Sequence, residues 1–247
     1  MSFRQKTLDE ARQRVADLCH DFDKYAAAFD TEGLFSGPSL YFHHKTLSIR
    51  RDLGGSVDAC LASESFFESL YATLASWGLH RMGPGNTKLV DLPVLVQSFR
   101  RVTDSLRKLE GLRIEDVSLR DVNRTGDLIW PIIRDLRVGI GNTKIISGTK
   151  ALHHLLPDLV PPIDREYTVQ FFFKNKNAVQ GDASKQRDAF LVMYAHFATI
   201  SRTCTDQIAS RLNRGMNTSV TKAIDNAIVG YGRVVLNLAG EQADEEG

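Results

Sequence analysis

Apolar residues recur every three or four positions along most of this chain, which is the spacing of one face of an α-helix. The strict alternation of a β-strand is hard to find, and its best example, residues 234–238, fits a helix better. The sequence therefore predicts an all-α protein of about nine or ten helices. The first series predicts a helix from about Thr7 to Phe29, with these residues on its buried face: Leu8, Ala11, Val15, Leu18, Phe22, Tyr25 and Phe29.

The other predicted helices follow from the same period and from capping residues. Asp91, Asp164, Asp182 and Ser219 each stand where a helix is expected to begin, and all are preferred N-cap residues. Residues 117–138 are expected to be helical in one piece or in two, because Pro131 would disturb a helix interior. The remaining helices are expected at residues 40–49, 57–77, 93–109, 142–156, 164–173, 187–212 (in one piece or two) and 219–238.

The composition fits one globular domain. The 247 residues are 43% hydrophobic and 25% charged, which is ample material for a single helical domain with two lobes. The net charge of +1 gives no overall basic field, although it is compatible with a local basic patch. Residues 242–247 are predicted to form a flexible acidic tail.

The sequence favours a cytoplasmic protein with no membrane partner. No apolar run approaches the ~20 residues of a membrane span, and the N-terminus lacks the apolar region of a signal peptide. Cys19, Cys60 and Cys204 are widely spaced and odd in number, which favours buried thiols in a reducing compartment.

A glycine turn at residues 138–144 is the first candidate for function. Gly139 and Gly141 allow a tight hairpin between two helices, with Ile140 expected to point inward as a plug. The amides of Gly141, Asn142 and Thr143 would then lie at a helix N-terminus, where free N–H groups and the helix dipole favour a phosphate. The alternative is a plain interhelical turn that binds nothing.

The second candidate is Asp164, which follows Pro161, Pro162 and Ile163. The prolines keep the approach extended, and Asp164 stands where the next helix begins. It lies 164 − 144 = 20 residues after Lys144. The alternative is that Asp164 only caps its helix.

Taken together, these features resemble the helix-hairpin-helix DNA glycosylase superfamily, of the endonuclease III and 8-oxoguanine glycosylase kind. The resemblance is carried by Gly139-Ile-Gly141, Lys144 and Pro162-Ile-Asp164, and it covers about residues 65–173. It implies a helix-hairpin-helix and aspartate region at residues 138–174. It also implies an enzyme that hydrolyses the N-glycosidic bond of a base flipped out of double-stranded DNA and leaves an abasic site. No cofactor and no metal are implied, and the enzyme is expected to be a monomer.

The resemblance also implies roles for single residues. Asp164 would stabilise the oxocarbenium-like sugar or activate water. The family usually places a lysine nucleophile two residues after the second glycine, where this chain has Thr143. Lys144 comes one residue later, so Lys150 is an alternative amine, and a monofunctional enzyme needs only the aspartate. Arg165 is expected to join the hairpin in binding DNA, and the base pocket is expected to hold four residues: Tyr41, Phe42, Trp77 and His80.

Departures from the family pattern leave the target base open. The family's wedge after the helix at 66–76 is replaced by residues 77–83, so a modified base, including one of phage DNA, is as compatible as common damage in DNA repair. The pairs His43-His44 and His153-His154 lack metal-ligand spacing, which favours structural or surface roles. Two other functional classes stay open. One is a non-catalytic helix-hairpin-helix DNA-binding or regulatory protein, and the other is an all-α interaction protein with an accidental hairpin.

Overall fold

Helices account for nearly all the regular structure of the protein. We describe a computed structural model, of which residues 3–31, 37–79 and 88–238 are described. Within these ranges the chain is all-α, as predicted, with isolated bridges but no strand. The helices are α1 Gln5–His20, α2 Phe22–Thr31, α3 Gly37–Asp52, α4 Val57–Ala62, α5 Glu64–Leu74, α6 Leu92–Arg101, α7 Thr103–Arg107, α8 Val122–Asp135, α9 Lys144–Leu155, α10 Gln170–Phe173, α11 Ala183–Thr203, α12 Thr205–Arg211 and α13 Val220–Val234. Three short turns of helix are η1 Ala75–Leu79, η2 Ile114–Asp116 and η3 Arg165–Val169.

Several predicted helices are divided in the structure. The helix expected from Thr7 to Phe29 is wrong as a single element, because the chain leaves helical geometry at Asp21, between α1 and α2. Ser63 separates α4 from α5, and its hydroxyl accepts a hydrogen bond from the Phe66 amide at 3.1 Å, as an N-cap does. The apolar period continues across these breaks, so it could not reveal them.

Pro131 does not divide α8, which is continuous from Val122 to Asp135. The proline lies on the exposed face of this helix. A carbonyl that loses its helical partner there can bind water. The predicted disturbance is therefore tolerated.

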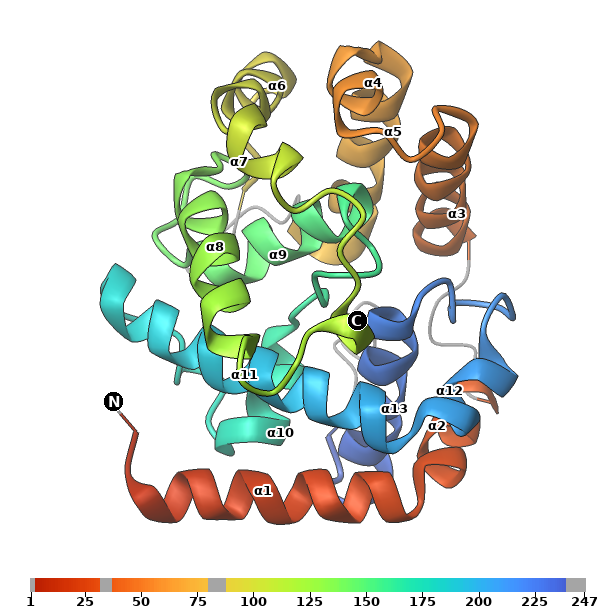
Figure 1. Ribbon diagram of the computed structural model, residues 1–247, viewed down its shortest axis with the longest axis vertical. Coiled ribbons are helices and arrows are strands. Elements are labelled where there is room, and N and C mark those ends of the chain that lie inside the picture. Colours follow the sequence, from red (N-terminus) through yellow and green to blue (C-terminus); the bar gives the residue numbers. More distant parts are fainter. Residues whose placement is uncertain (1–2, 32–36, 80–87, 239–247) are drawn as a thin grey trace, which may run out of the picture.

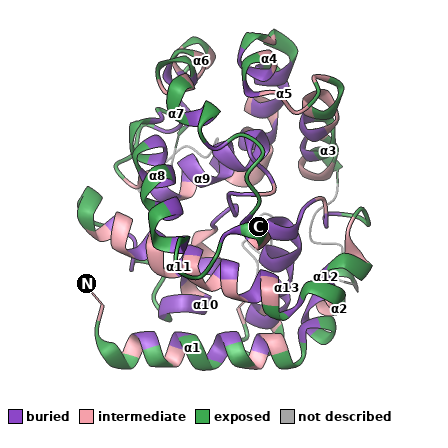
Figure 2. Cartoon of the chain, viewed as in Figure 1, coloured by how far each residue is buried: buried purple, intermediate pink, exposed green. Residues whose placement is uncertain are grey.

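The helices are arranged in two groups. In Figure 1, α4, α6 and α7 lie at one end and α1 lies at the other; α9 lies between them, and α13 runs beside α2 in the lower half. Both α9 and α13 are almost wholly buried (Figure 2). One continuous apolar core extends from α1 to α13. Polar side chains carried by α9 and α13 are therefore placed inside the molecule.

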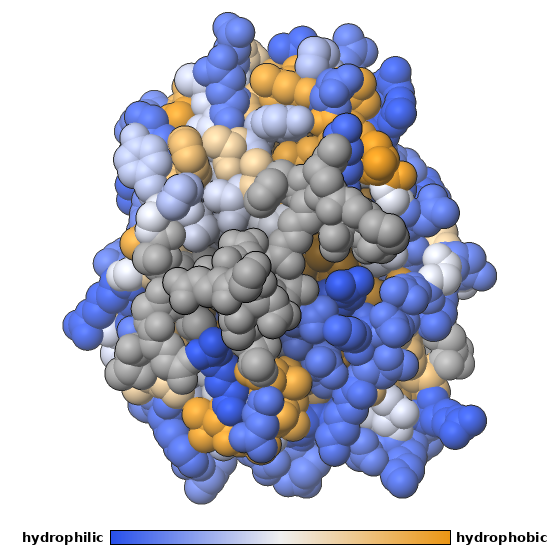
Figure 3. All heavy atoms as spheres, turned by 180° about the vertical axis from the view of Figure 1, so that it is seen from behind, coloured by the Kyte–Doolittle hydropathy of each residue, from blue (hydrophilic) through white to orange (hydrophobic). Residues whose placement is uncertain are grey.

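The surface gives few clues of its own. The face opposite to that of Figure 1 is mostly hydrophilic, with hydrophobic areas toward its upper and lower ends (Figure 3). None of the helices in the described ranges has both the length and the apolar character that a membrane span requires. The predicted tail at residues 242–247 lies outside the described residues.

Candidate functional site

The glycine turn lies between α8 and α9, where the resemblance places a hairpin. A short antiparallel bridge fixes it, because the Val90 amide donates to the Val138 carbonyl and the Ile140 amide to the Lys88 carbonyl, each at 3.0 Å. Ile140 is 66% exposed, so the predicted inward plug is wrong. Neither Gly139 nor Gly141 takes a positive φ, so the turn does not use the freedom that glycine offers there.

The start of α9 is partly closed to ligands. The buried Gln186 of α11 accepts hydrogen bonds from the Lys144 and Ile145 amides, at 2.8 and 3.3 Å. The preceding residues Gly141 and Asn142 are exposed, and their amides have no acceptor within the described ranges. The amides that remain for a phosphate are therefore those of the turn itself.

Lys150 and Asp164 form the ion pair at the centre of the site. Lys150 lies in the second turn of α9, and its Nζ is 3.1 Å from Asp164 Oδ2 and 3.5 Å from the Trp77 carbonyl oxygen. The other carboxylate oxygen of Asp164 accepts hydrogen bonds from the Glu166 and Tyr167 amides, at 2.8 and 3.2 Å. Asp164 thus caps η3 as predicted. Its side chain is 31% exposed, so the carboxylate still reaches solvent.

These contacts keep the carboxylate ionised. Burial acts to raise the pKa of Asp164, but the Lys150 ammonium and the two amides outweigh it, so the pKa lies below its usual value. A carboxylate that is charged, fixed at both oxygens and open to solvent can stabilise a positive charge that develops beside it.

A second ion pair, which is more deeply buried than the first, lies on α13. Lys222 Nζ is 2.6 Å from Asp225 Oδ2 on α13, and the two side chains are 2% and 5% exposed. The Thr168 hydroxyl donates to Asp225 Oδ1 and accepts the hydrogen bond of the Asp164 amide, each at 3.2 Å. The two pairs therefore form one network that joins α9, η3 and α13.

Buried histidines extend this network. His154 Nδ1 donates to the Lys150 carbonyl at 2.8 Å, so the other nitrogen of its neutral ring accepts from His43 Nδ1 at 3.0 Å. The remaining nitrogen of His43 accepts from the Thr218 hydroxyl at 2.9 Å. Burial is the largest cause that lowers the pKa of His43, His153 and His154, so all three rings are neutral near pH 7.

The predicted base-pocket residues are only partly brought together. Trp77 belongs to the network: its ring stacks on that of His43 at a centroid distance of 5.1 Å, and Lys222 Nζ lies 5.4 Å from its centre. Trp77 and Tyr167 also pack against a small apolar cluster formed by Phe29, Met216 and Val229. On α3, Tyr41 is 61% exposed and contacts Phe42 edge-on. His80 lies outside the described residues.

Two other predicted residues lie apart from this network. Lys144 lines a separate recess of about 330 Å³, together with Arg134, Asn142 and Gln186, and it makes no ion pair with Asp164. Arg165 pairs with its neighbour Glu166 at 3.3 Å. Of the two candidate amines, the structure places Lys150 at the aspartate.

The sequence analysis missed Lys222, Asp225 and Thr168. Thr168 and Asp225 are 57 positions apart, so no local spacing connects them. A usable signal was the composition of α13, in which the charged residues Lys222 and Asp225 stand among mostly small and apolar residues. A helix that is apolar all round is a core helix, so charged residues within it need a partner or a function.

The described residues contain no group of three or more His, Cys, Asp or Glu side chains placed to hold a metal ion. No protein-family model matches the chain, and comparison with curated proteins and with solved structures finds no significant similarity.

Proposed function

We propose that this protein is a DNA glycosylase-like enzyme that hydrolyses the N-glycosidic bond of a damaged or modified base and leaves an abasic site. The observation that carries the proposal is the geometry of Asp164. Its carboxylate is held by Lys150 and by two amides of η3, yet it is 31% exposed. That arrangement fits a carboxylate aimed at a sugar from which a base departs.

Asp164 would act on the sugar as the base leaves. The C1′–N bond breaks with its electron pair going to the base, and positive charge develops on the sugar, next to the carboxylate. Water then adds its oxygen to C1′ and releases a proton, which the departing base can take up. The carboxylate contributes by placing negative charge where positive charge develops, in a site fixed before the reaction.

Lys150 is proposed to position Asp164 rather than to attack the sugar. Its Nζ is engaged by the carboxylate and by the Trp77 carbonyl, whereas a Schiff-base nucleophile needs a free, uncharged amine. The pairing thus supports the monofunctional route. Borohydride is then expected to trap no covalent adduct with DNA.

The glycine turn is proposed to hold the DNA backbone. Gly141 and Asn142 present exposed amides, and Lys144 and Arg134 line the adjoining recess. Amides at a turn and nearby cations are a common way to bind phosphate. The partner would be double-stranded DNA with a flipped base, bound by a monomer in the cytoplasm.

The second candidate is a non-catalytic DNA-binding or regulatory protein. Trp77 favours it, because this predicted base-stacking ring already packs against His43, His154 and Lys222. Such a protein would keep the turn and the fold but release no base.

Asp164→Asn is expected to lower the rate of base release at least ~100-fold, because the substitution removes the charge while an asparagine can still cap η3. The measurement is abasic-site formation under single-turnover conditions on duplexes that carry a panel of damaged bases and modified phage bases. The matched control is Asp121→Asn, which changes the exposed N-cap aspartate of α8 in the same way. The control is expected to keep the wild-type rate.

The same assay separates the alternatives. If the wild-type protein binds every duplex but makes no abasic site, the non-catalytic reading holds. If it fails to bind any duplex at low salt, the hairpin is accidental. A substrate cleaved by the wild-type protein also shows whether its target is damage or a phage modification.

A further inference from the structure

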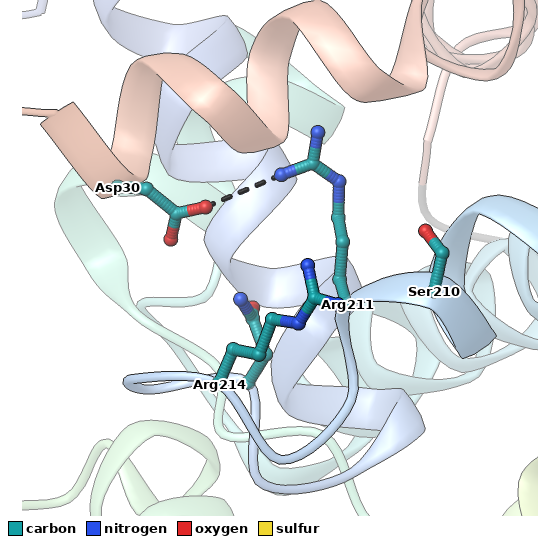
Figure 4. A pocket seen from close by; sticks show the side chains of 5 residues that line it. Asp30, Ser210, Arg211 and Arg214 are labelled. Carbon is teal, nitrogen blue, oxygen red and sulfur yellow. Dashed lines mark hydrogen bonds and ion pairs between the residues drawn. The ribbon is translucent and has the colours of Figure 1, made fainter.

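A recess of about 250 Å³ opens between α2, α12 and the turn before α13. Its lining comes from three elements: Asp30 near the end of α2, Ser210 and Arg211 in α12, and Arg214 and Asn217 in the turn before α13 (Figure 4). Sequence analysis singled out none of these residues.

Arg211 is a fixed part of the recess. Its Nε is 2.9 Å from Asp23 Oδ1, its Nη2 donates to the Asp23 carbonyl at 3.0 Å, and its Nη1 is 3.2 Å from Asp30 Oδ2. Three of the five N–H groups of the guanidinium are used in these bonds. The contact with Asp30 also occupies the one carboxylate that lines the recess (Figure 4).

Arg214 supplies the donors that remain unmatched. It is exposed, and no hydrogen bond or ion pair engages its side chain within the described ranges. Figure 4 shows it extended toward the space beside Arg211 and Asp30. Because Asp23 and Asp30 already compensate Arg211, Arg214 is the guanidinium of this lining that can take a further anion.

Asn217 adds an amide group to the lining of the recess. It is 2% exposed, and Asn226 engages one end of its amide at 2.8 Å. The other end has no partner among the described residues, and Asn217 lines the recess. The unpartnered end of the Asn217 amide and the Arg214 guanidinium can both donate to a singly charged oxyanion.

The chain segments that line the recess also contact the candidate site. Phe29, next to Asp30, lies 5.8 Å from Lys222 Nζ, and Met216, next to Asn217, belongs to the same apolar cluster. Asn226, the partner of Asn217, follows Asp225 in α13. The chain segments that line the recess therefore also contribute residues that contact the network of the candidate site.

We propose that this recess binds one backbone phosphodiester of a DNA strand whose target nucleotide enters the candidate site. Only the entry of the target nucleotide into the candidate site rests on the proposed function. Phosphodiester binding itself needs no catalysis. Arginine side chains and amides are the usual donors to a phosphodiester, and its single negative charge can pair with Arg214.

The test is binding of single-stranded oligothymidylate of twelve nucleotides, which carries no damaged base, across a range of salt concentrations. Arg214→Gln is expected to weaken binding about fivefold at low salt and to reduce the slope of log K against log salt by about one. Arg120→Gln is the control, because it removes an equally exposed arginine that precedes α8. The control is expected to change binding less and to keep the lining intact.

Three results would overturn the proposal. They are equal losses in the two variants, no binding of the oligothymidylate by the wild-type protein, and Arg214-dependent binding of inorganic phosphate without binding of the oligothymidylate. The last result would assign the recess to a small free anion. Loss of oligothymidylate binding in Arg214→Gln alone would support the recess even if base release were never found, so the two proposals fail separately.

Discussion

The protein is expected to lose stability as the pH falls from 6 to 4. The pKa of His154 falls to about 4 in the folded state, chiefly because the ring is buried, and the pKa values of His43 and His153 are lowered well below their usual range for the same reason. The unfolded chain binds protons at these rings near the ordinary histidine pKa of ~6.5. The unfolded state therefore binds more protons in this window, and stability is lost as the pH falls through it.

The size of the effect is large compared with the stability of a domain. For His154 alone, the difference between an unfolded pKa near 6.5 and a folded pKa of about 4 corresponds to about 3 kcal/mol at low pH. A folded domain is stable by only ~5–15 kcal/mol, and His43 and His153 add to the loss. Burial raises the pKa of Asp225, which acts in the opposite direction and offsets part of it.

The measurement is the midpoint of unfolding in urea, monitored by circular dichroism, at pH values from 7.5 to 4. His154→Gln should flatten the dependence on pH, because one proton-binding ring of the unfolded state is gone. His44→Gln, which changes the exposed neighbour of His43, should leave it unchanged. A wild-type midpoint that stays constant down to pH 4 would show that the buried rings are not neutral.

Gly230→Ala is expected to destabilise the fold by at least ~3 kcal/mol, as overpacking between rigid groups does. A Cβ at this position would lie 1.9 Å from the Tyr25 carbonyl oxygen and 3.3 Å from the Phe29 amide nitrogen. Both are backbone atoms of α2, so no side-chain rotation relieves the contact. The ~1 kcal/mol that alanine gains over glycine in a helix does not offset this clash.

Thermal unfolding measures this effect, with an expected fall in Tm of roughly 6–12 °C. Gly232→Ala is the matched control in the same helix. Its Cβ would lie 3.1 Å from Tyr167 Cδ1 and 3.2 Å from Leu238 Cδ1, which are side-chain atoms that can move. Equal stability of the two variants would mean that α2 and α13 do not approach as closely as the structure shows.

The fold class could be predicted because most helices bury one face, and their apolar residues repeat accordingly. Most caps were readable: Asp164, Asp182 and Ser219 each accept a hydrogen bond from an amide at the start of a helix, whereas Asp91 precedes α6 without a side-chain capping bond. Breaks at Asp21 and Ser63 were missed, because the buried stripe continues across them. The orientation of Ile140 was wrong, since it depends on the bridge to residues 88–90, and no local pattern encodes that bridge.

The candidate site was predictable only where its residues lie close in sequence. Asp164 and Lys150 are 14 positions apart, within one turn-and-helix unit, and both were identified. Lys222 and Asp225 reach the same network from α13, and His43 reaches it from α3. Contacts of that range are set by tertiary packing, so a single sequence shows them only as polar residues in otherwise buried helices.

We propose that the Lys150–Asp164 pair serves the candidate site and does not hold the fold together. The most direct measurement is the free energy of unfolding, in urea at pH 7, of the double variant Lys150→Met/Asp164→Asn. Removing both partners of a partly buried ion pair is often neutral or stabilising, and asparagine can keep the cap of η3. We expect a value within ~1 kcal/mol of the wild-type protein, or above it. A loss of more than ~3 kcal/mol would show that the pair holds the fold together, and would contradict the account.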